Sequence, residues 1–344
     1  MKIGIYSPYL DTLGGGERYM ISLASHWSKS HEVYLYWDSL ATIQDLAKRF
    51  DLDVSRITVR RNVFSRGLIQ KLAETKRLDL LFILSDGSVP YSLARKNIIH
   101  FQVPFKTITL GMIKNFIYSK FIFNSEFTRF KSDPRIHSKS SVIYPGVTMY
   151  SIGNKDETTI LSVGRFEGFY KVKKQGVLIN AFKRMKDMGI KKEVKLLLAG
   201  GLLSRDQEYF NSLKSMAQGL NIEFYPNVSY DDLASLYTTS SVYWHAAGFG
   251  ESDPKRMEHF GISTVESMSA GCIPIVFNGG GLHEIIRRET EGFLWSTEEQ
   301  LIQKTRTVLS HPFSEKSRIN IRKRAMDFRD SVFFDAFDRL LQSL

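Results

Sequence analysis

Short apolar runs alternate with amphipathic stretches along the chain, and the series runs twice. The runs that predict strands fall at residues 2–7, 32–37, 78–84, 97–101, 159–163, 194–199, 222–225, 242–245 and 273–277. The stretches with helical spacing fall at residues 17–28, 176–188, 206–218, 231–237 and 264–270. Strands that alternate with helices form parallel sheets with helices on both faces. The sequence therefore predicts an α/β fold with two doubly wound domains.

A turn-forming Tyr-Pro-Gly sequence, which ends at Gly146, separates the two series. Polar residues follow it, and we expect the interdomain linker within residues 146–157. The first domain would then span residues 1–149 and the second residues 150–330. The end of the chain, about residues 331–344, has apolar side chains at helical spacing, which predicts a helix with one buried face.

The composition excludes several classes of protein. Of the 344 residues, 43% are hydrophobic and 24% are charged, which is ordinary for a globular protein and unlike a disordered, collagen-like or disulfide-rich chain. The single cysteine, Cys272, cannot form an internal disulfide, so we expect a cytoplasmic location. No apolar run reaches the roughly 18 residues that a membrane-spanning helix needs, so we do not expect the chain to cross a membrane.

The positive charge is concentrated in the first half of the chain. The net charge is +11, and residues 1–150 hold 21 Lys and Arg against 12 Asp and Glu, a balance of +9. Such a surface suits nucleic acid, an anionic membrane or a phosphorylated substrate. The alternative is a solvated basic face that aids solubility.

Glycines follow the first predicted strand and lead directly into a helix. Gly14, Gly15 and Gly16 let a ligand approach the backbone, and free N–H groups at a helix start favour an anion such as phosphate. Tyr19 stands where a dinucleotide-binding G-x-G-x-x-G pattern would have its last glycine. A plain tight turn explains these glycines equally well.

The first strand of the second domain ends in a basic loop. Gly164 and Arg165 follow the strand directly, and Lys171, Lys173 and Lys174 come next. A guanidinium and an ammonium near the carboxyl end of a strand suit a pyrophosphate. For any one of the lysines, the alternative is surface charge ahead of a helix.

The most specific motif holds Glu258 and Glu266 on either side of a glycine and a predicted helix start. The N–H groups of residues 262–265 would face an anion there. Ser263 and Glu266 also fit a capping box, which would explain Glu266 as a helix-closing residue but neither Glu258 nor the glycine. Residues 279–281 add a fourth glycine turn after a strand, and one phosphate-rich ligand explains the four turns more economically than four separate causes.

These motifs together resemble glycosyltransferase family 4 over nearly the whole chain. The matching segments are residues 14–18, 124–127, 143–147, 162–166 (Ser-Val-Gly-Arg-Phe), 173–182 and 258–271, which holds the Glu258-x7-Glu266 pattern. The resemblance implies a GT-B fold, in which two Rossmann-like domains face each other across a cleft and the last helix returns to the first domain.

The resemblance also implies an activity. Such enzymes move a hexose, with retention of anomeric configuration, from a nucleoside diphosphate sugar to a glycan or lipid-linked acceptor in polysaccharide or glycoconjugate synthesis. GDP-mannose is the first expected donor and a UDP-linked sugar the second. We expect no cofactor and no metal, because the sequence has no clustered His, Asp and Glu with metal-ligand spacing.

Each residue that matches the family has an implied role. Arg165 and Lys173 would hold the diphosphate, Glu258 would contact the transferred sugar, and Glu266 would bind the ribose. The base is expected near residues 226–230. The complete set of expected donor contacts is Gly15, Gly16, Arg165, Lys173, Asn227, Glu258, Phe260, Gly261, Ile262, Ser263, Val265 and Glu266.

One position departs from the family pattern. A histidine two residues before a proline often lies beside the reacting sugar in this family, and here that place is Gln102, with His100 two residues earlier on the same strand face. Gln102 and His100 therefore join Arg165, Lys173 and Glu258 as candidate catalytic residues, with a packed core histidine as the equal alternative for His100. The charged loop 250–257 is a second departure, and we expect it to rim the donor site.

The expected partners are the nucleotide sugar and a glycan or lipid-linked acceptor. Phenylalanines and lysines intermingle within residues 101–131, a mixture that suits an anionic membrane surface and a peripheral position on the inner face of the membrane. The alternative is that these phenylalanines are core residues. No nucleic-acid module is visible, so nucleic acid is not expected. The alternative function is a non-catalytic sugar- or nucleic-acid-binding protein on a GT-B scaffold.

Overall fold

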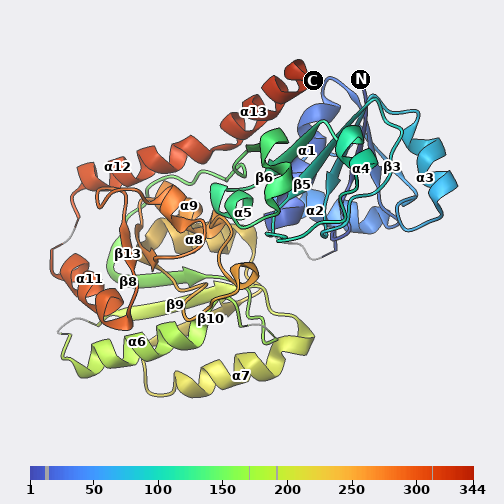
Figure 1. The fold of residues 1–344 in the computed structure, drawn as a ribbon. Helices are drawn as coiled ribbons and strands as arrows, with labels where there is room; N and C mark the ends of the chain where they lie inside the picture. Colours follow the sequence, from blue (N-terminus) through green and yellow to red (C-terminus); the bar gives the residue numbers. More distant parts are fainter. Residues whose placement is uncertain (12–14, 170, 191–192, 312) are drawn as a thin grey trace. The chain divides into compact units, whose positions relative to one another are not determined.

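A computed structural model describes residues 1–11, 15–169, 171–190, 193–311 and 313–344. The chain forms two compact units (Figure 1), the first made of Met1–Gly146 with Asp330–Leu344 and the second of Val147–Arg329. The break falls after Gly146, where the sequence predicted it after residue 149, and the returning segment begins at Asp330.

The first unit is built on a parallel sheet of seven strands in the order β3-β2-β1-β4-β5-β6-β7. The strands are β1 (Lys2–Tyr6), β2 (Glu32–Tyr36), β3 (Ile57–Arg60), β4 (Leu80–Leu84), β5 (Lys96–Phe101), β6 (Lys120–Phe123) and β7 (Ser140–Val142). The helices are α1 (Gly15–Ser28), α2 (Leu40–Phe50), α3 (Leu68–Thr75), α4 (Met112–Ile117), α5 (Glu126–Phe130) and, from the end of the chain, α13 (Asp330–Ser343).

The side chains of β4 show why this sheet needs a cover on both faces. Leu80, Phe82 and Leu84 belong to one buried cluster. Leu81 and Ile83, which alternate with them, belong to another. Successive strand residues point to opposite faces, so an uninterrupted apolar run can be satisfied only when both faces are buried.

The second unit is built on a parallel sheet of six strands in the order β10-β9-β8-β11-β12-β13. The strands are β8 (Asp156–Val163), β9 (Lys195–Gly200), β10 (Ile222–Pro226), β11 (Ser240–His245), β12 (Ile273–Phe277) and β13 (Phe293–Trp295). The helices are α6 (Gln175–Asp187), α7 (Gln207–Met216), α8 (Tyr230–Thr239), α9 (Ile262–Ser269), α10 (Leu282–Ile285), α11 (Glu298–Ser310) and α12 (Glu315–Ala325).

Both sheets reverse their strand order beside their first strand, as doubly wound folds do. The prediction of two doubly wound α/β domains is therefore confirmed. In such sheets, ligands bind beyond the carboxyl ends of the strands near the point of reversal. In the second unit that point lies between β8 and β11.

Helix α13 packs into the first unit rather than the second. Phe337 is fully buried, and its ring meets those of Trp27 and Phe82 edge to face. At the start of the helix, Arg18 donates to both carboxylate oxygens of Asp330 at 3.0 and 3.2 Å and to the Gly146 carbonyl at 2.8 Å. The apolar stripe predicted at the end of the chain is thus buried against the first sheet.

Within the described residues, the helices are too short or too polar to span a lipid bilayer. Two of the phenylalanines from residues 101–131, Phe116 and Phe130, are 89% and 67% exposed. Phe101, Phe121 and Phe123 are fully buried in strands, so the alternative that they are core residues is correct for these three.

The burial of Phe337 predicts a large loss of stability when the ring is removed. Phe337→Ala should lower the free energy of unfolding of the first unit by about 3–5 kcal/mol, because it leaves a cavity between α1, β4 and α13. Asp335→Ala, an exposed position on the same helix, should change it by about 0.5 kcal/mol or less. Urea denaturation followed by tryptophan fluorescence measures both; equal losses in the two variants would contradict the packing of α13.

Candidate active site

The loops that follow β8, β9, β11 and β12 meet at one edge of the second sheet, because all its strands are parallel. The loop after β8 is held there by its neighbours. The Gly164 N–H donates to the Ala199 carbonyl at 2.9 Å, and the Phe166 N–H to that of Gly201 at 2.8 Å. The Gln175 side chain, at the start of α6, donates to the Arg165 carbonyl at 3.0 Å. The exposed Arg165 guanidinium therefore extends from a fixed backbone.

Three charged or titratable side chains meet beside this loop. The Lys173 ammonium donates to Oε2 of Glu258 at 2.6 Å, and Nε2 of His245 lies 3.0 Å from the same oxygen. The Glu258 side chain is 14% exposed and that of His245 is 3% exposed. The cluster joins residues from β11, from the loop before α6 and from the loop before α9.

The electrostatics of the cluster keep Glu258 ionised. Burial by itself raises the pKa of the Glu258 carboxyl, but the Lys173 charge and the His245 hydrogen bond outweigh burial and hold that pKa well below its ordinary value. Burial lowers the pKa of His245, although Glu258 opposes this. Nδ1 of His245 has no hydrogen-bond partner in the part of the chain that the structure describes, as suits a neutral imidazole that donates from Nε2 to Glu258.

Glycines fix the backbone around Glu258. Gly261 has φ of +111° and begins α9 without a side-chain cap. Gly280 has φ of +66°, and a Cβ there would lie 2.0 Å from the Glu258 carbonyl oxygen. The Gly281 N–H donates to that carbonyl at 2.8 Å. A side chain at Gly280 would push the turn off Glu258, so two of the four glycine turns combine to set the position of this carboxylate.

The capping-box interpretation of Ser263 and Glu266 is wrong. The helix begins at Ile262 with Gly261 as its N-cap, so Ser263 already lies within the first turn. Its hydroxyl accepts a hydrogen bond from Tyr243 at 2.8 Å. The Glu266 carboxylate accepts one from Tyr237 at 2.9 Å. Both side chains therefore accept hydrogen bonds from buried tyrosines.

The other site residues predicted in this unit offer their backbones to a ligand or hold neighbouring loops together. The side chains of Phe260 and Val265 are buried, which leaves only their backbones for contact with a ligand. The Asn227 side chain pairs with the N–H and carbonyl of Leu202 at 2.8 and 2.9 Å, so it joins the loops after β9 and β10. Ile262 and Ser263 occupy the first turn of α9, where backbone N–H groups lack helical partners.

The charged loop 250–257 contributes a second lysine–carboxylate pair. The Lys174 ammonium lies 2.5 Å from Oε1 of Glu251, and these side chains are 19% and 13% exposed. Consecutive lysines at the start of α6 are thus each held by a carboxylate, Lys173 by Glu258 and Lys174 by Glu251. Neither His245 nor Glu251 was predicted from the sequence as a site residue.

The candidate residues of the first unit form their own group at the ends of β1 and β5. The Gln102 side chain donates to the Gly16 carbonyl at 3.2 Å. Gly16 follows Gly15 at the start of α1, whereas Gly14 lies outside the described residues. A Cβ on Gly16 would lie 2.3 Å from Oε1 of Gln102, so the amide packs closely over this glycine.

The structure does not support a catalytic role for His100. Its side chain is fully buried and stacks on the Tyr19 ring at 4.0 Å between centroids, with Nδ1 3.2 Å from the Ile122 carbonyl. Burial lowers the pKa of His100 to about 3, so the ring is neutral. His100 is therefore a packed core histidine. Gln102 remains the candidate catalytic residue at the end of β5.

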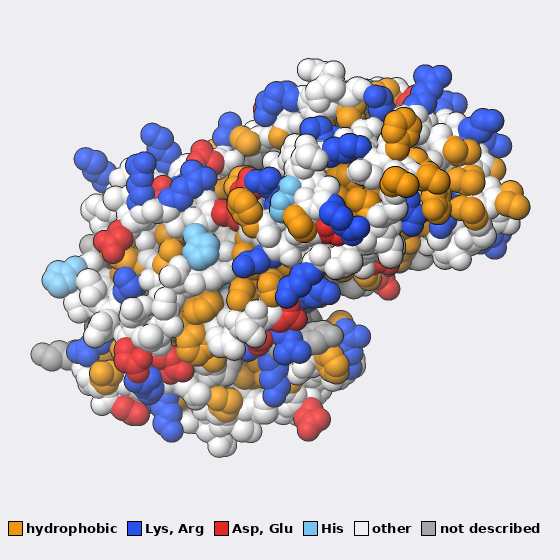
Figure 2. Space-filling model, viewed as in Figure 1, with side chains coloured by type: hydrophobic (Ala, Val, Ile, Leu, Met, Phe, Trp, Pro, Cys, Tyr) orange, Lys and Arg blue, Asp and Glu red, His pale blue; other side chains and the backbone are white. Residues whose placement is uncertain are grey.

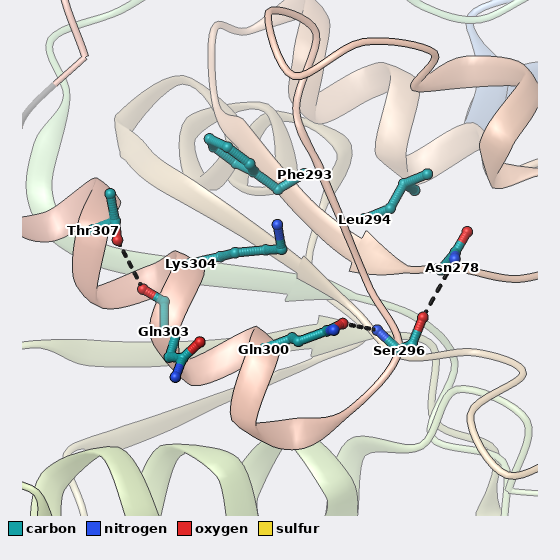
Figure 3. Close-up of a pocket in the computed structure, with 8 residues that line it drawn as sticks. All are labelled: Asn278, Phe293, Leu294, Ser296, Gln300, Gln303, Lys304 and Thr307. Carbon is teal, nitrogen blue, oxygen red and sulfur yellow. Dashed lines mark hydrogen bonds between the residues drawn. The ribbon is translucent and has the colours of Figure 1, made fainter.

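A separate hollow of about 600 Å³ lies between β13 and α11 (Figure 3). Its polar side chains support the turn beside it: Gln300 accepts from the Ser296 N–H at 2.8 Å, and Asn278 donates to the Ser296 hydroxyl at 3.3 Å. This hollow holds none of the predicted site residues, so we place the candidate site at the Glu258 cluster. Within the described ranges, no three His, Cys, Asp or Glu side chains gather as a metal site requires.

Comparison with known proteins gives a family for the second unit. The family described as "Glycosyl transferases group 1" matches residues 151–327. Curated relatives named "GDP-Man:Man(3)GlcNAc(2)-PP-Dol alpha-1,2-mannosyltransferase" include one from Mus musculus, 31% identical over 194 residues, and one from Dictyostelium discoideum, 32% identical over 160 residues. The matched segments cover 52% and 44% of this chain and 37% and 30% of those relatives.

Solved structures resemble the whole chain. Anabaena HepE in complex with UDP superposes with a TM-score of 0.75 at 17% identity, and each chain is covered fully. A glycosyltransferase from Rickettsia africae superposes with a TM-score of 0.75 at 18% identity, covering 99% of this chain and 97% of its own. At such identities the likeness concerns the fold, and it confirms the predicted GT-B class with two Rossmann-like domains.

The Glu258 cluster predicts a strong coupling between its two charged members. In a double-mutant cycle with Lys173→Met and Glu258→Gln, the coupling free energy of unfolding should be about 1–3 kcal/mol, because either single change leaves a mostly buried group without its partner. The exposed pair Arg184–Glu299 of the same unit is the control. Its double-mutant cycle should give a coupling free energy of about 0.5 kcal/mol or less.

Denaturant unfolding at neutral pH measures both cycles. Because the pKa of Glu258 is depressed in the fold, its contribution is complete at neutral pH and is lost only as the pH falls through that depressed value. A coupling at Lys173 and Glu258 no larger than that of the control pair would contradict the electrostatic account.

Proposed function

The chain belongs to the glycosyl transferases of group 1, and we propose that it is a mannosyltransferase with GDP-mannose as donor and a lipid-linked glycan as acceptor. The names of the curated relatives support both substrates. Those relatives are matched over about a third of their length, so the donor, the acceptor and the linkage belong to this proposal. Membership of family 4 and retention of configuration, which the sequence motifs imply, belong to it as well.

The observation that carries the proposal is the ionised, mostly buried Glu258 held by Lys173 and His245 at the carboxyl edge of the second sheet. A fixed carboxylate can accept hydrogen bonds from sugar hydroxyls. The cation beside it can bind a diphosphate, and Arg165 offers a second set of donors. One site thus provides acceptors for a sugar and donors for its leaving group.

The proposed reaction uses these donors in the step that breaks the bond. When the bond between the sugar C1 and the diphosphate oxygen breaks, the electron pair stays on the diphosphate. Arg165 and Lys173 would stabilise that charge, which otherwise requires a metal ion. The acceptor hydroxyl then bonds to C1 from the face that the diphosphate leaves, and a diphosphate oxygen on that face can take its proton. No cofactor and no metal enter this scheme.

In this scheme the Lys173 ammonium can pair with either of two anions, the Glu258 carboxylate or the bound diphosphate. In the structure its ammonium pairs with Glu258. A bound diphosphate carries more negative charge than one carboxylate, so it would draw Lys173 away and leave the Glu258 oxygens for the sugar. His245, which donates to the same carboxylate from β11, would keep Glu258 oriented during that exchange.

The first unit would present the acceptor. Its basic surface and the close pair of Gln102 and Gly16 suit an acceptor with phosphate groups, and we place the reaction at the cytoplasmic face of a membrane. The membrane surface proposed for residues 101–131 belongs to the same scheme. A non-catalytic sugar-binding protein on this fold is the alternative, and it would use the Glu258 carboxylate for binding without transferring the sugar.

This proposal predicts a donor preference that holds in EDTA. Saturating GDP-mannose should raise the unfolding temperature, because a ligand at a hundred times its Kd adds about 2.7 kcal/mol to the free energy of unfolding. UDP-glucose at the same concentration should raise the unfolding temperature less. Transfer of labelled mannose to a lipid-linked glycan should proceed in EDTA. Arg165→Ala should lower kcat/KM by roughly a hundredfold, because it removes donors to the leaving diphosphate.

Arg184→Ala is the matched control, since this arginine lies on α6 and pairs with Glu298 and Glu299. Its kcat/KM should stay at the wild-type value. Preference for UDP-glucose would reject the proposed donor, and loss of transfer in EDTA would reject the metal-free scheme. Unchanged turnover in Arg165→Ala would reject the role of Arg165 at the leaving diphosphate. Donor binding by the wild type without any transfer would favour the non-catalytic alternative.

A further inference from the structure

Large apolar side chains are exposed together on α3, α4 and the loop of residues 91–93 in the first unit. Ile69, Met112 and Phe116 are 84%, 92% and 89% exposed. Every residue of α4 is at least partly exposed, although the helix reads Met-Ile-Lys-Asn-Phe-Ile. We define the α3–α4 face by its exposed apolar side chains: Leu68, Ile69, Tyr91, Leu93, Met112, Ile113 and Phe116.

Two contacts make the three segments neighbours. The Leu93 N–H donates to the Thr75 hydroxyl at the end of α3 at 3.0 Å. The Lys114 ammonium of α4 lies 4.8 Å from the centre of the Tyr91 ring. Figure 2 shows hydrophobic side chains gathered over the part of the molecule where Figure 1 draws α3 and α4, with Lys and Arg around them.

Positive charge lies within and beside the α3–α4 face. Residues 66–77 hold four Lys and Arg against Glu74, which already pairs with Arg60. Residues 106–120 hold three lysines and no acidic residue. Burial, and then the charge of Lys114, lower the pKa of Lys71, which shows that the ammonium groups of α3 and α4 are close enough to interact.

We propose that the α3–α4 face docks on the surface of an anionic lipid bilayer. Exposed helices of this kind place their apolar side chains at the boundary of headgroups and acyl chains, while lysines extend their ammonium groups to lipid phosphates. A protein partner fits the face less well, because lysine is depleted from protein–protein interfaces, whereas Lys71 and Lys114 lie among the apolar residues.

This surface differs from the one expected at residues 101–131. Within that segment α4 contributes to the face, but Phe101, Phe121 and Phe123 are buried and contribute nothing to it. Four of the seven side chains of the face come from α3 and residues 91–93, which the sequence did not connect with a membrane. The inference rests on the membrane location included in the proposed function, but docking requires neither donor nor acceptor, so it can fail while the proposed transfer reaction stands.

Vesicle flotation with the full chain tests the inference. The chain should float with vesicles of phosphatidylglycerol and phosphatidylcholine in equal parts, bind weakly to phosphatidylcholine alone, and dissociate in high salt. The double variant Ile69→Ser, Phe116→Ser should reduce the partition coefficient for the anionic vesicles at least about tenfold, because it removes two apolar side chains that would otherwise insert into the lipid.

Phe130→Ser is the matched control, because Phe130 is an exposed phenylalanine of the same unit and lies on α5, which Figure 1 draws apart from α3 and α4. It should bind like the wild type. Circular dichroism should show both variants folded, since all the changed side chains are exposed. No binding of the wild type to anionic vesicles, or equal binding by the double variant, would overturn the proposal. So would a wild-type dimer in size-exclusion chromatography that the double variant abolishes, since the face would then be a self-association surface.

Discussion

A carboxylate removed from water stays ionised only if the protein supplies the charge and hydrogen bonds that water would have given it. Glu258 meets that condition through Lys173 and His245, which approach the same oxygen from two other elements. The turn of residues 279–281 holds the Glu258 backbone, and Gly261 begins the helix that follows. The strand order brings these loops to one edge, so the architecture of the second unit brings the three side chains together.

The fold was predictable where burial is apolar and two-sided. Runs such as β4 and β12 have no polar interruption, and their bounds were predicted to within two residues. The short strands β3 and β13 were missed because they are only four and three residues long and partly exposed. Helix α12 was missed because it packs through arginine: Arg318 is buried against Glu157 and the Gly271 carbonyl, and an apolar-periodicity search does not detect such a helix.

The candidate site was predictable where a motif constrains the backbone as well as the side chain. Arg165, Lys173 and Glu258 stand beside glycine turns, and the strand order places them at one edge. His245 was not named because its contact with Glu258 depends on how β11 and the following loop fold together. For His100 the sequence left two roles open, a participant and a packed residue, since strand periodicity gives the face on which a residue lies but not the Tyr19 ring stacked against it. The capping box failed for a similar reason, because buried tyrosines bind Ser263 and Glu266.

The central claim is that the Glu258 cluster is the donor site and that Lys173 changes partner when the donor binds. A crystal structure of the chain with GDP-mannose tests it most directly. The account predicts the diphosphate within hydrogen-bond distance of Arg165 and Lys173, the mannose hydroxyls against Glu258, and a Lys173–Glu258 distance longer than the 2.6 Å described above. A nucleotide bound away from this edge, with the Lys173–Glu258 contact unchanged, would contradict it.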